Sequence, residues 1–83
     1  MKLAKYVKFR EEKFGGVVFE TRSEKVYTLN PSAAAVLREI EDGADEHEIP
    51  KRVQARFQDA SGAIEREVTA LIAELRQKGL VED

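Results

Sequence analysis

The first third of the chain alternates between apolar and polar residues with a period of two. Segments rich in β-branched and aromatic residues predict three strands, at Tyr6–Arg10, Val17–Thr21 and Lys25–Leu29. Gly15-Gly16 and the polar run 22–24 are the predicted turns between them. A three-stranded antiparallel sheet is therefore expected over about residues 6–29.

The same alternation predicts which side chains of the third strand point inward. Tyr27 and Leu29 fall on one face, and Val26 and Thr28 fall on the other. We expect Tyr27 and Leu29 to face the core.

After Leu29 the spacing of the apolar residues becomes helical. Asn30-Pro31 supplies a favourable N-cap residue followed by proline at the first helical position, and Gly43 permits a left-handed stop. These signals predict a first helix over about residues 31–42.

Two further apolar stripes predict helices over about residues 46–58 and 62–78. Asp45 and Glu48 have the spacing of a capping box for the earlier of the two, but Pro50 would then remove a backbone hydrogen bond inside it. Gly79 is expected to end the last helix, and only the final two residues are expected to be free.

Three strands followed by three helices predict an α+β fold that is winged helix-turn-helix-like. The length of 83 residues suits a single domain over residues 1–83. No apolar run is long enough to span a bilayer, and the start of the chain lacks the apolar centre of a signal peptide. We therefore expect a cytoplasmic protein that has no membrane partner.

Candidate catalytic groups are few. The absence of cysteine excludes disulfides and thiolate chemistry. His47 is the only histidine, and a lone histidine rarely makes a metal site. Glu65 and Glu67 are close to each other in the sequence, but they fall on polar helix positions rather than in a predicted pocket. The sequence predicts no catalytic residue, no metal site and no cofactor.

Many helix-turn-helix proteins bind DNA, so the charges of the third predicted helix matter. Acidic and basic residues are mixed on it, and the net charge of the chain is -2. Carboxylates on a groove-reading helix would meet phosphates at close range. Nucleic acid is not expected as a partner, although a winged-helix DNA-binding or protein-interaction regulator is the alternative function.

The strand Lys25–Leu29 is expected to be an edge of the sheet, with one row of backbone donors and acceptors unpaired. A peptide can add there as a further strand, and a helix beside the edge would complete a groove. The other interpretation is an edge that is merely protected by Lys25 and by its shortness. Geometry alone favours neither.

Longer stretches of the sequence resemble the PqqD-like family. The residues that carry the resemblance are the run from Val26 to Leu37, Glu41-Asp42-Gly43, the run from Val68 to Leu75, and Gly79-Leu80-Val81. They follow the order and spacing of the family from about Phe14 to Val81. Pro50 departs from the family pattern, as does Arg66 or Glu67, which stands near where relatives often carry aspartate.

The resemblance implies a stand-alone peptide chaperone, a RiPP (ribosomally synthesised peptide) recognition element that holds the leader of a precursor peptide. In that family the leader adds as a strand to the third strand and lies against the third helix. The positions that match here are Lys25, Val26, Tyr27, Thr28 and Leu29 on the strand, and Arg66, Glu67, Ala70, Leu71 and Glu74 on the helix. Two helix flanks stay open as the wall of the groove, one with Glu67, Glu74 and Lys78 and one with Glu65, Thr69 and Arg76.

The resemblance also implies a partner enzyme. Stand-alone members usually accompany a radical S-adenosylmethionine (SAM) enzyme, and others serve lasso-peptide proteases. Any iron-sulfur cluster would belong to that enzyme, because this chain has no cysteine to bind one. The oligomeric state stays open, since an exposed edge strand can also pair with a second copy.

Overall fold

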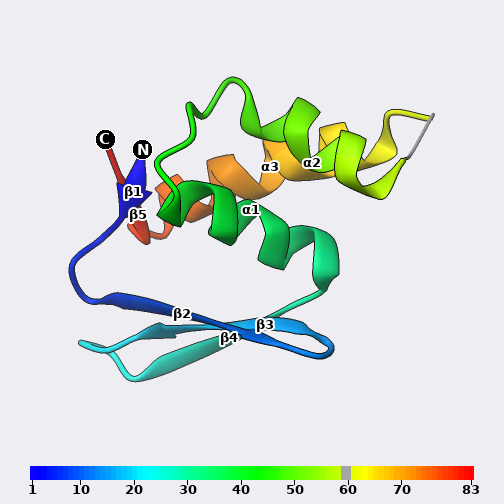
Figure 1. Cartoon of the computed structure of the whole chain (residues 1–83). Coiled ribbons are helices and arrows are strands. Elements are labelled where there is room, and N and C mark those ends of the chain that lie inside the picture. The colour runs from blue at the N-terminus through cyan, green and yellow to red at the C-terminus, as the bar shows by residue number, and fades with distance from the viewer. Residues whose placement is uncertain (59–60) are drawn as a thin grey trace.

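The computed structural model describes residues 1–58 and 61–83. Its elements, in chain order, are β1 (Lys2–Leu3), β2 (Val7–Glu12), β3 (Gly15–Glu20), β4 (Lys25–Leu29), α1 (Pro31–Glu41), α2 (Ile49–Phe57), α3 (Ala63–Gln77) and β5 (Val81–Glu82). They form two layers, with the sheet on one side and the helices on the other, where α1 packs on β3 and α2 and α3 pack against α1 and against each other (Figure 1). None of the described helices is long and apolar enough to cross a membrane.

The main sheet has the strand order β2-β3-β4, and both pairs of strands are antiparallel. Val18 lies opposite Phe9 on one side and Tyr27 on the other, and the three side chains face the helices together. The predicted α+β fold with a three-stranded antiparallel sheet and three helices is confirmed.

The predicted faces of β4 are also confirmed. Tyr27 and Leu29 are half-buried and pack against the core, whereas Val26 is 55% exposed on the opposite face and Thr28 is exposed with it. The strand therefore presents one apolar face to the helices.

The first turn lies elsewhere than the sequence predicts. Gly15 and Gly16 are paired with Glu12 and Glu11 inside the sheet, so the turn consists of residues 13 and 14. Close packing explains why glycine occupies these positions, because a Cβ added at Gly16 would lie 2.7 Å from the ring of Phe9. These glycines are needed for the approach of neighbouring groups and not for the reversal of the chain.

Helix α1 begins and ends as predicted. The Asn30 side chain accepts a hydrogen bond from the Ala33 amide at 2.8 Å, and Pro31 occupies the first helical position. At the other end Gly43 has φ +80°, and the Ala44 amide donates to the carbonyl of Glu39 at 3.0 Å. This bond completes a Schellman stop, which turns the chain toward α2.

The predicted start of the second helix at residue 46 is wrong, because α2 begins at Ile49. The Asp45 carboxylate accepts a hydrogen bond from the His47 amide at 2.8 Å and closes a local turn instead of a capping box. Pro50 therefore lies in the first turn of α2, where its missing N–H costs no helical hydrogen bond. The polar break predicted between this helix and the next includes residues 59 and 60, which lie outside the described part of the chain.

Helix α3 spans Ala63–Gln77, and the predicted stop at Gly79 is confirmed, because Gly79 follows the C-cap residue with φ +72°. The prediction that the last two residues are free is wrong. Glu82 lies opposite Lys2 in the antiparallel pair of β1 and β5, and Asp83 accepts a hydrogen bond from Arg76 at 2.9 Å. Two-residue strands contain too few positions to show an alternating pattern, so the sequence does not reveal this pair.

Replacing Gly15 with alanine is expected to lower the free energy of unfolding by about 3 kcal/mol. The added Cβ would overlap the carbonyl oxygen of Leu29 and lie 2.6 Å from the carbonyl carbon of Asn30, at a backbone φ of +143°. Gly43→Ala is the matched control, because φ is +80° there but nothing lies within 4 Å of an added Cβ. The control should lose about 1 kcal/mol in urea denaturation, and equal losses would contradict the steric argument.

Candidate functional site

The edge strand β4 is the centre of the candidate site. It pairs with β3 on one side and with no other strand in the described part of the chain. The C-terminal strand β5 does not cover it, because β5 pairs with β1 at another place in the molecule (Figure 1). One row of backbone donors and acceptors of Lys25–Leu29 is therefore open to a further strand.

A hollow of about 270 Å³ lies between β4 and α3. The residues that line it are Val18, Tyr27, Thr28, Leu29, Asn30, Ala33, Leu71, Glu74, Leu75, Lys78 and Leu80. Its floor is apolar, since Val18, Leu75 and Leu80 are buried core residues. Its rim is charged, with Glu74 and Lys78 3.8 Å apart and the Lys78 ammonium 5.5 Å from the centre of the Tyr27 ring.

A second hollow, of about 280 Å³, continues along α3 toward its N-terminus. It is lined by Asn30, Ser32, Ala33, Glu67, Val68 and Leu71, and it shares Asn30, Ala33 and Leu71 with the first hollow. Together the two hollows form one channel beside the open edge, which we call the β4–α3 groove. An extended segment that paired with β4 would place side chains against α3 in this groove.

The structure settles which flank of α3 lies beside the edge. Glu67, Leu71, Glu74 and Lys78 line the groove, one turn after another along the helix. The other flank, with Glu65, Thr69 and Arg76, lines a separate hollow together with residues of the loop before α2.

The predicted site residues are therefore brought together only in part. The strand residues form the edge, although the Val26 side chain points to the opposite face, and Glu67, Leu71 and Glu74 lie across from it. Arg66 and Ala70 are exposed on α3 and line neither hollow of the groove. Lys78, which the sequence placed on one candidate flank but not among the matching peptide-binding positions, also lines the groove, four residues after Glu74.

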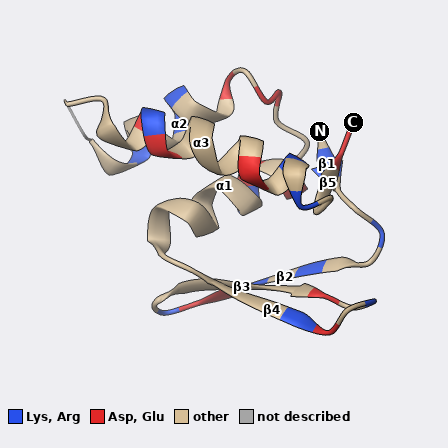
Figure 2. Ribbon diagram, turned by 180° about the vertical axis from the view of Figure 1, so that it is seen from behind, with Lys and Arg blue, Asp and Glu red and all other residues tan. Residues whose placement is uncertain are grey.

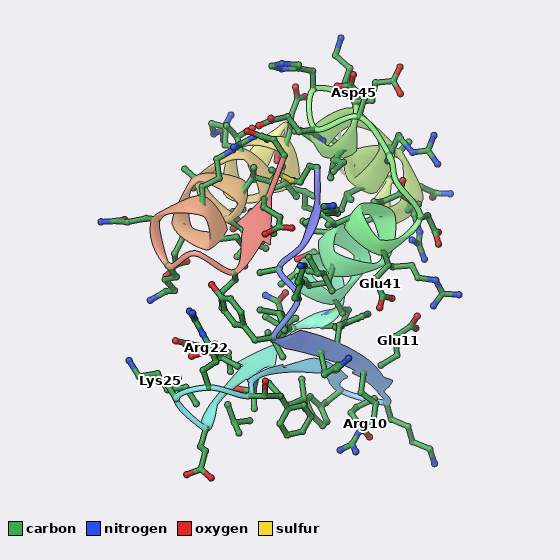
Figure 3. The ribbon with its side chains drawn as sticks, turned by 90° about the vertical axis from the view of Figure 1, so that its left-hand side faces the viewer. Arg10, Glu11, Arg22, Lys25, Glu41 and Asp45 are labelled. Atoms are coloured by element: carbon green, nitrogen blue, oxygen red, sulfur yellow. The ribbon has the colours of Figure 1, made fainter. Side chains whose placement is uncertain are left out.

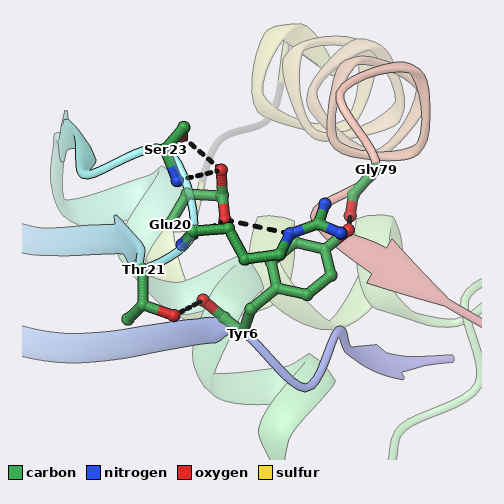
Figure 4. A network of polar contacts seen from close by, with 6 residues as sticks. Tyr6, Glu20, Thr21, Ser23 and Gly79 are labelled. Carbon is green, nitrogen blue, oxygen red and sulfur yellow. Dashed lines mark hydrogen bonds and ion pairs between the residues drawn. The ribbon is translucent and has the colours of Figure 1, made fainter.

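The C-terminal end of α3 is fixed to the sheet by Tyr6. Its hydroxyl donates a hydrogen bond to the carbonyl of Gly79 at 2.8 Å, and the Arg22 guanidinium lies 3.4 Å from the centre of its ring (Figure 4). Leu80 then folds back into the core, with its amide bonded to the carbonyl of Leu75. These contacts tie the C-terminal end of α3 to the start of β2 and to the turn before β4.

The turn before β4 is organised by the Glu20 carboxylate. It accepts hydrogen bonds from the backbone amides of Arg22 at 2.9 Å and Ser23 at 3.1 Å, and a further one from the Ser23 hydroxyl (Figure 4). The Ser23 hydroxyl bond is the largest of the effects that hold the pKa of Glu20 below its ordinary value. The same carboxylate thus sets the path of the chain into the edge strand.

The charges on the molecule are mixed. Lys and Arg are interspersed with Asp and Glu over the molecule (Figure 2), which gives no support to binding of a polyanion. Across residues 1–58 and 61–83, no group of three or more His, Asp or Glu side chains is placed to hold a metal ion.

A two-layer α+β domain of the winged-helix type, with an open edge strand beside its last helix, is the class that this fold and site define. Residues 15–81 match the family of the coenzyme PQQ synthesis protein D (PqqD), so this chain belongs to the PqqD family.

Two solved structures share the fold. Lasso peptide synthetase B1 complexed with the leader peptide aligns with a TM-score of 0.78 at 21% identity, covering 99% of this chain and 96% of the other. TbiB1 in complex with the TbiA(beta) leader peptide aligns with a TM-score of 0.82 at 20% identity, covering 99% and 95%. No curated protein is significantly similar to this chain.

The stability of the protein is expected to fall as the pH drops below 4.5, the ordinary pKa of Glu20. Because the pKa is lowered in the folded state, the Glu20 carboxylate stabilises the fold fully above its ordinary pKa. That contribution is lost as the pH falls through the lowered value. Melting temperatures measured between pH 3 and 7 should fall less steeply for Glu20→Gln than for the unmodified chain.

Glu24→Gln is the control for this measurement. Glu24 lies in the same turn, and no hydrogen bond to its carboxylate is found among the described residues. Its acid profile should follow that of the unmodified chain. Identical profiles for all three proteins would show that Glu20 does not link the turn to pH.

Proposed function

We propose that this chain is a leader-peptide recognition element. It binds the leader of a ribosomally synthesised precursor peptide as an added strand on β4 and presents the precursor to a modifying enzyme. The observation that carries the proposal is the unpaired edge of β4 beside the apolar β4–α3 groove. Membership of the PqqD family supports it, as do two neighbours of the same fold that were solved with leader peptides.

The two outer strands of the sheet differ in a way that favours a binding role for β4. The opposite edge, β2, carries Lys8, Arg10, Glu11 and Glu12 among its six residues, and charged side chains of this kind discourage strand addition. The sequence of β4 is Lys-Val-Tyr-Thr-Leu, with one charged residue at its start. If both edges needed protection only, β4 would be expected to carry charges like those of β2.

Main-chain pairing provides affinity, and the groove provides selection. Ordering a flexible leader costs roughly 2–5 kcal/mol, so backbone bonds need the help of apolar anchors to reach micromolar affinity. Leu71, Leu75 and Tyr27 supply the apolar surface for leucine or isoleucine side chains of the leader.

The proposed partner is a peptide-modifying enzyme that supplies all of the chemistry. A radical SAM enzyme is the first candidate because of the PqqD relationship, and a lasso-peptide protease is the second because of the neighbouring folds. The proposed place of action is the cytoplasm, where the precursor is synthesised. A gene for a short precursor beside a gene for such an enzyme would identify both partners.

Titration of the ¹⁵N-labelled protein with that leader is expected to shift the amides of Lys25–Leu29 and of the groove flank of α3. Leu71→Ala should weaken binding about tenfold, because it removes part of the apolar surface that an anchor side chain covers. Isothermal titration calorimetry measures the change in Kd.

Ile64→Ala is the matched control. Ile64 is also a half-buried residue of α3 that packs against the core, but it lines neither hollow of the groove. Its removal should affect stability more than affinity. Unchanged spectra at millimolar leader, or equal losses of affinity in the two variants, would refute binding in the groove.

A further inference from the structure

Two charged residues that form no ion pair within residues 1–58 and 61–83 lie toward opposite ends of the β4–α3 groove, Glu67 in its lining and Lys25 just beyond Tyr27 on the strand. Glu67 lines the hollow at the N-terminal end of the groove flank, and Lys25 is the exposed first residue of β4. Neither forms an ion pair within the described residues, whereas Glu74 and Lys78 between them pair with each other at 3.8 Å. The end of the groove at Glu67 is therefore acidic, and the end toward Lys25 is basic.

Strand β4 and helix α3 run in opposite directions past each other. Leu29 and Asn30, at the end of β4, lie with Leu71, and Asn30 also lies with Glu67. Tyr27 lies beside Lys78, the C-cap residue of α3. Lys25 lies two residues before Tyr27 on β4, at the same end of the sheet as Arg22 (Figure 3). Arg22 stacks on the ring of Tyr6, and the Tyr6 hydroxyl donates a hydrogen bond to the carbonyl of Gly79 just after α3.

The direction of an added strand follows from the sheet. Both existing pairs are antiparallel, and antiparallel pairing is the more stable kind per residue. A strand added antiparallel to β4 runs from Leu29 toward Lys25, and so from Glu67 toward Lys78. Its residues opposite Leu29, Tyr27 and Lys25 are spaced by two and all point toward α3.

From this register we infer that the preferred ligand carries the motif basic-x-apolar-x-acidic, read from its N-terminus, and this inference rests on the proposed function. The basic side chain lies opposite Leu29, with its aliphatic stem on Leu71 and its charge near Glu67. The apolar side chain enters the hollow at Tyr27. The acidic side chain lies opposite Lys25, about 13 Å from the basic one along the strand.

Three synthetic peptides with the same flanking residues test this motif. They carry Lys-x-Leu-x-Glu, the reversed order Glu-x-Leu-x-Lys, and the neutral Gln-x-Leu-x-Gln. Fluorescence anisotropy at low salt should show the first binding about tenfold more tightly than the second, with the neutral peptide between them. The difference should shrink at 0.5 M salt, because these charges are exposed and screened.

The double variant Glu67→Lys/Lys25→Glu should exchange the ranking of the two charged peptides. Glu65→Lys/Lys8→Glu is the matched control, with the same exchange of charges on the other flank of α3 and on β2. That control should keep the original ranking. Both variants leave the apolar floor of the groove intact.

The outcomes separate the inference from the proposed function. If all three peptides shift the β4 amides with equal affinity, the charge motif is wrong and strand addition stands. If the reversed peptide binds best to the unmodified chain, the direction is wrong. If none of the three binds but the natural leader does, the motif is also overturned. If the natural leader leaves the β4 amides unchanged as well, the proposed function itself fails.

Discussion

The hydrogen bond from the Tyr6 hydroxyl to the Gly79 carbonyl, together with the turn that buries Leu80, is the constraint on which the groove depends. It places the end of α3 over the sheet and then sends the chain away from β4. Val81 consequently pairs with Leu3 in the small terminal sheet. A C-terminal segment that instead continued toward β4 would fill the open edge, so this local geometry is what leaves a binding surface available.

An open edge next to a well-packed core is stable only if the core does not rely on it. Here the core lies between the three helices and the inner face of the sheet, where Val36, Leu37 and Val18 are almost fully buried. The buried carboxylate of Glu39 is paired with Arg52 at 2.5 Å, which fixes α2 against α1 without involving β4. The edge can therefore gain or lose a partner while the fold persists, which the proposed function requires.

Much of the fold could be predicted from the sequence because its signals are local. Asn30-Pro31, Gly43 and Gly79 mark helix ends through backbone preferences that need no tertiary contact. Where tertiary packing decides, the prediction was wrong. Gly15 and Gly16 resemble a turn in sequence but are required by the close approach of Phe9 and of the end of β4. The start of α2 depends on a hydrogen bond of Asp45 that competes with the capping box.

The candidate site, like the fold, could be predicted from the sequence only in part. That β4 is an edge follows from the order of strands, but the two flanks of α3 lie symmetrically about its apolar stripe. Only the packing of Val68, Ile72 and Leu75 and the anchor at Gly79 determine which flank turns toward β4. A sequence pattern with a period of 3.6 contains no information on that rotation.

The two-residue period of a strand also limits how much of a ligand this groove can select. Of five residues opposite β4, the three that lie opposite Leu29, Tyr27 and Lys25 face α3, and the two between them face away on the side of Val26. Backbone pairing, which any sequence can make, then supplies part of the affinity, and the three side chains that face α3 supply the rest together with the selection. A groove of this kind favours moderate affinity and rapid exchange, because few side chains are immobilised and little apolar surface is covered. Those properties fit the proposed function, in which the peptide passes from this groove to a modifying enzyme.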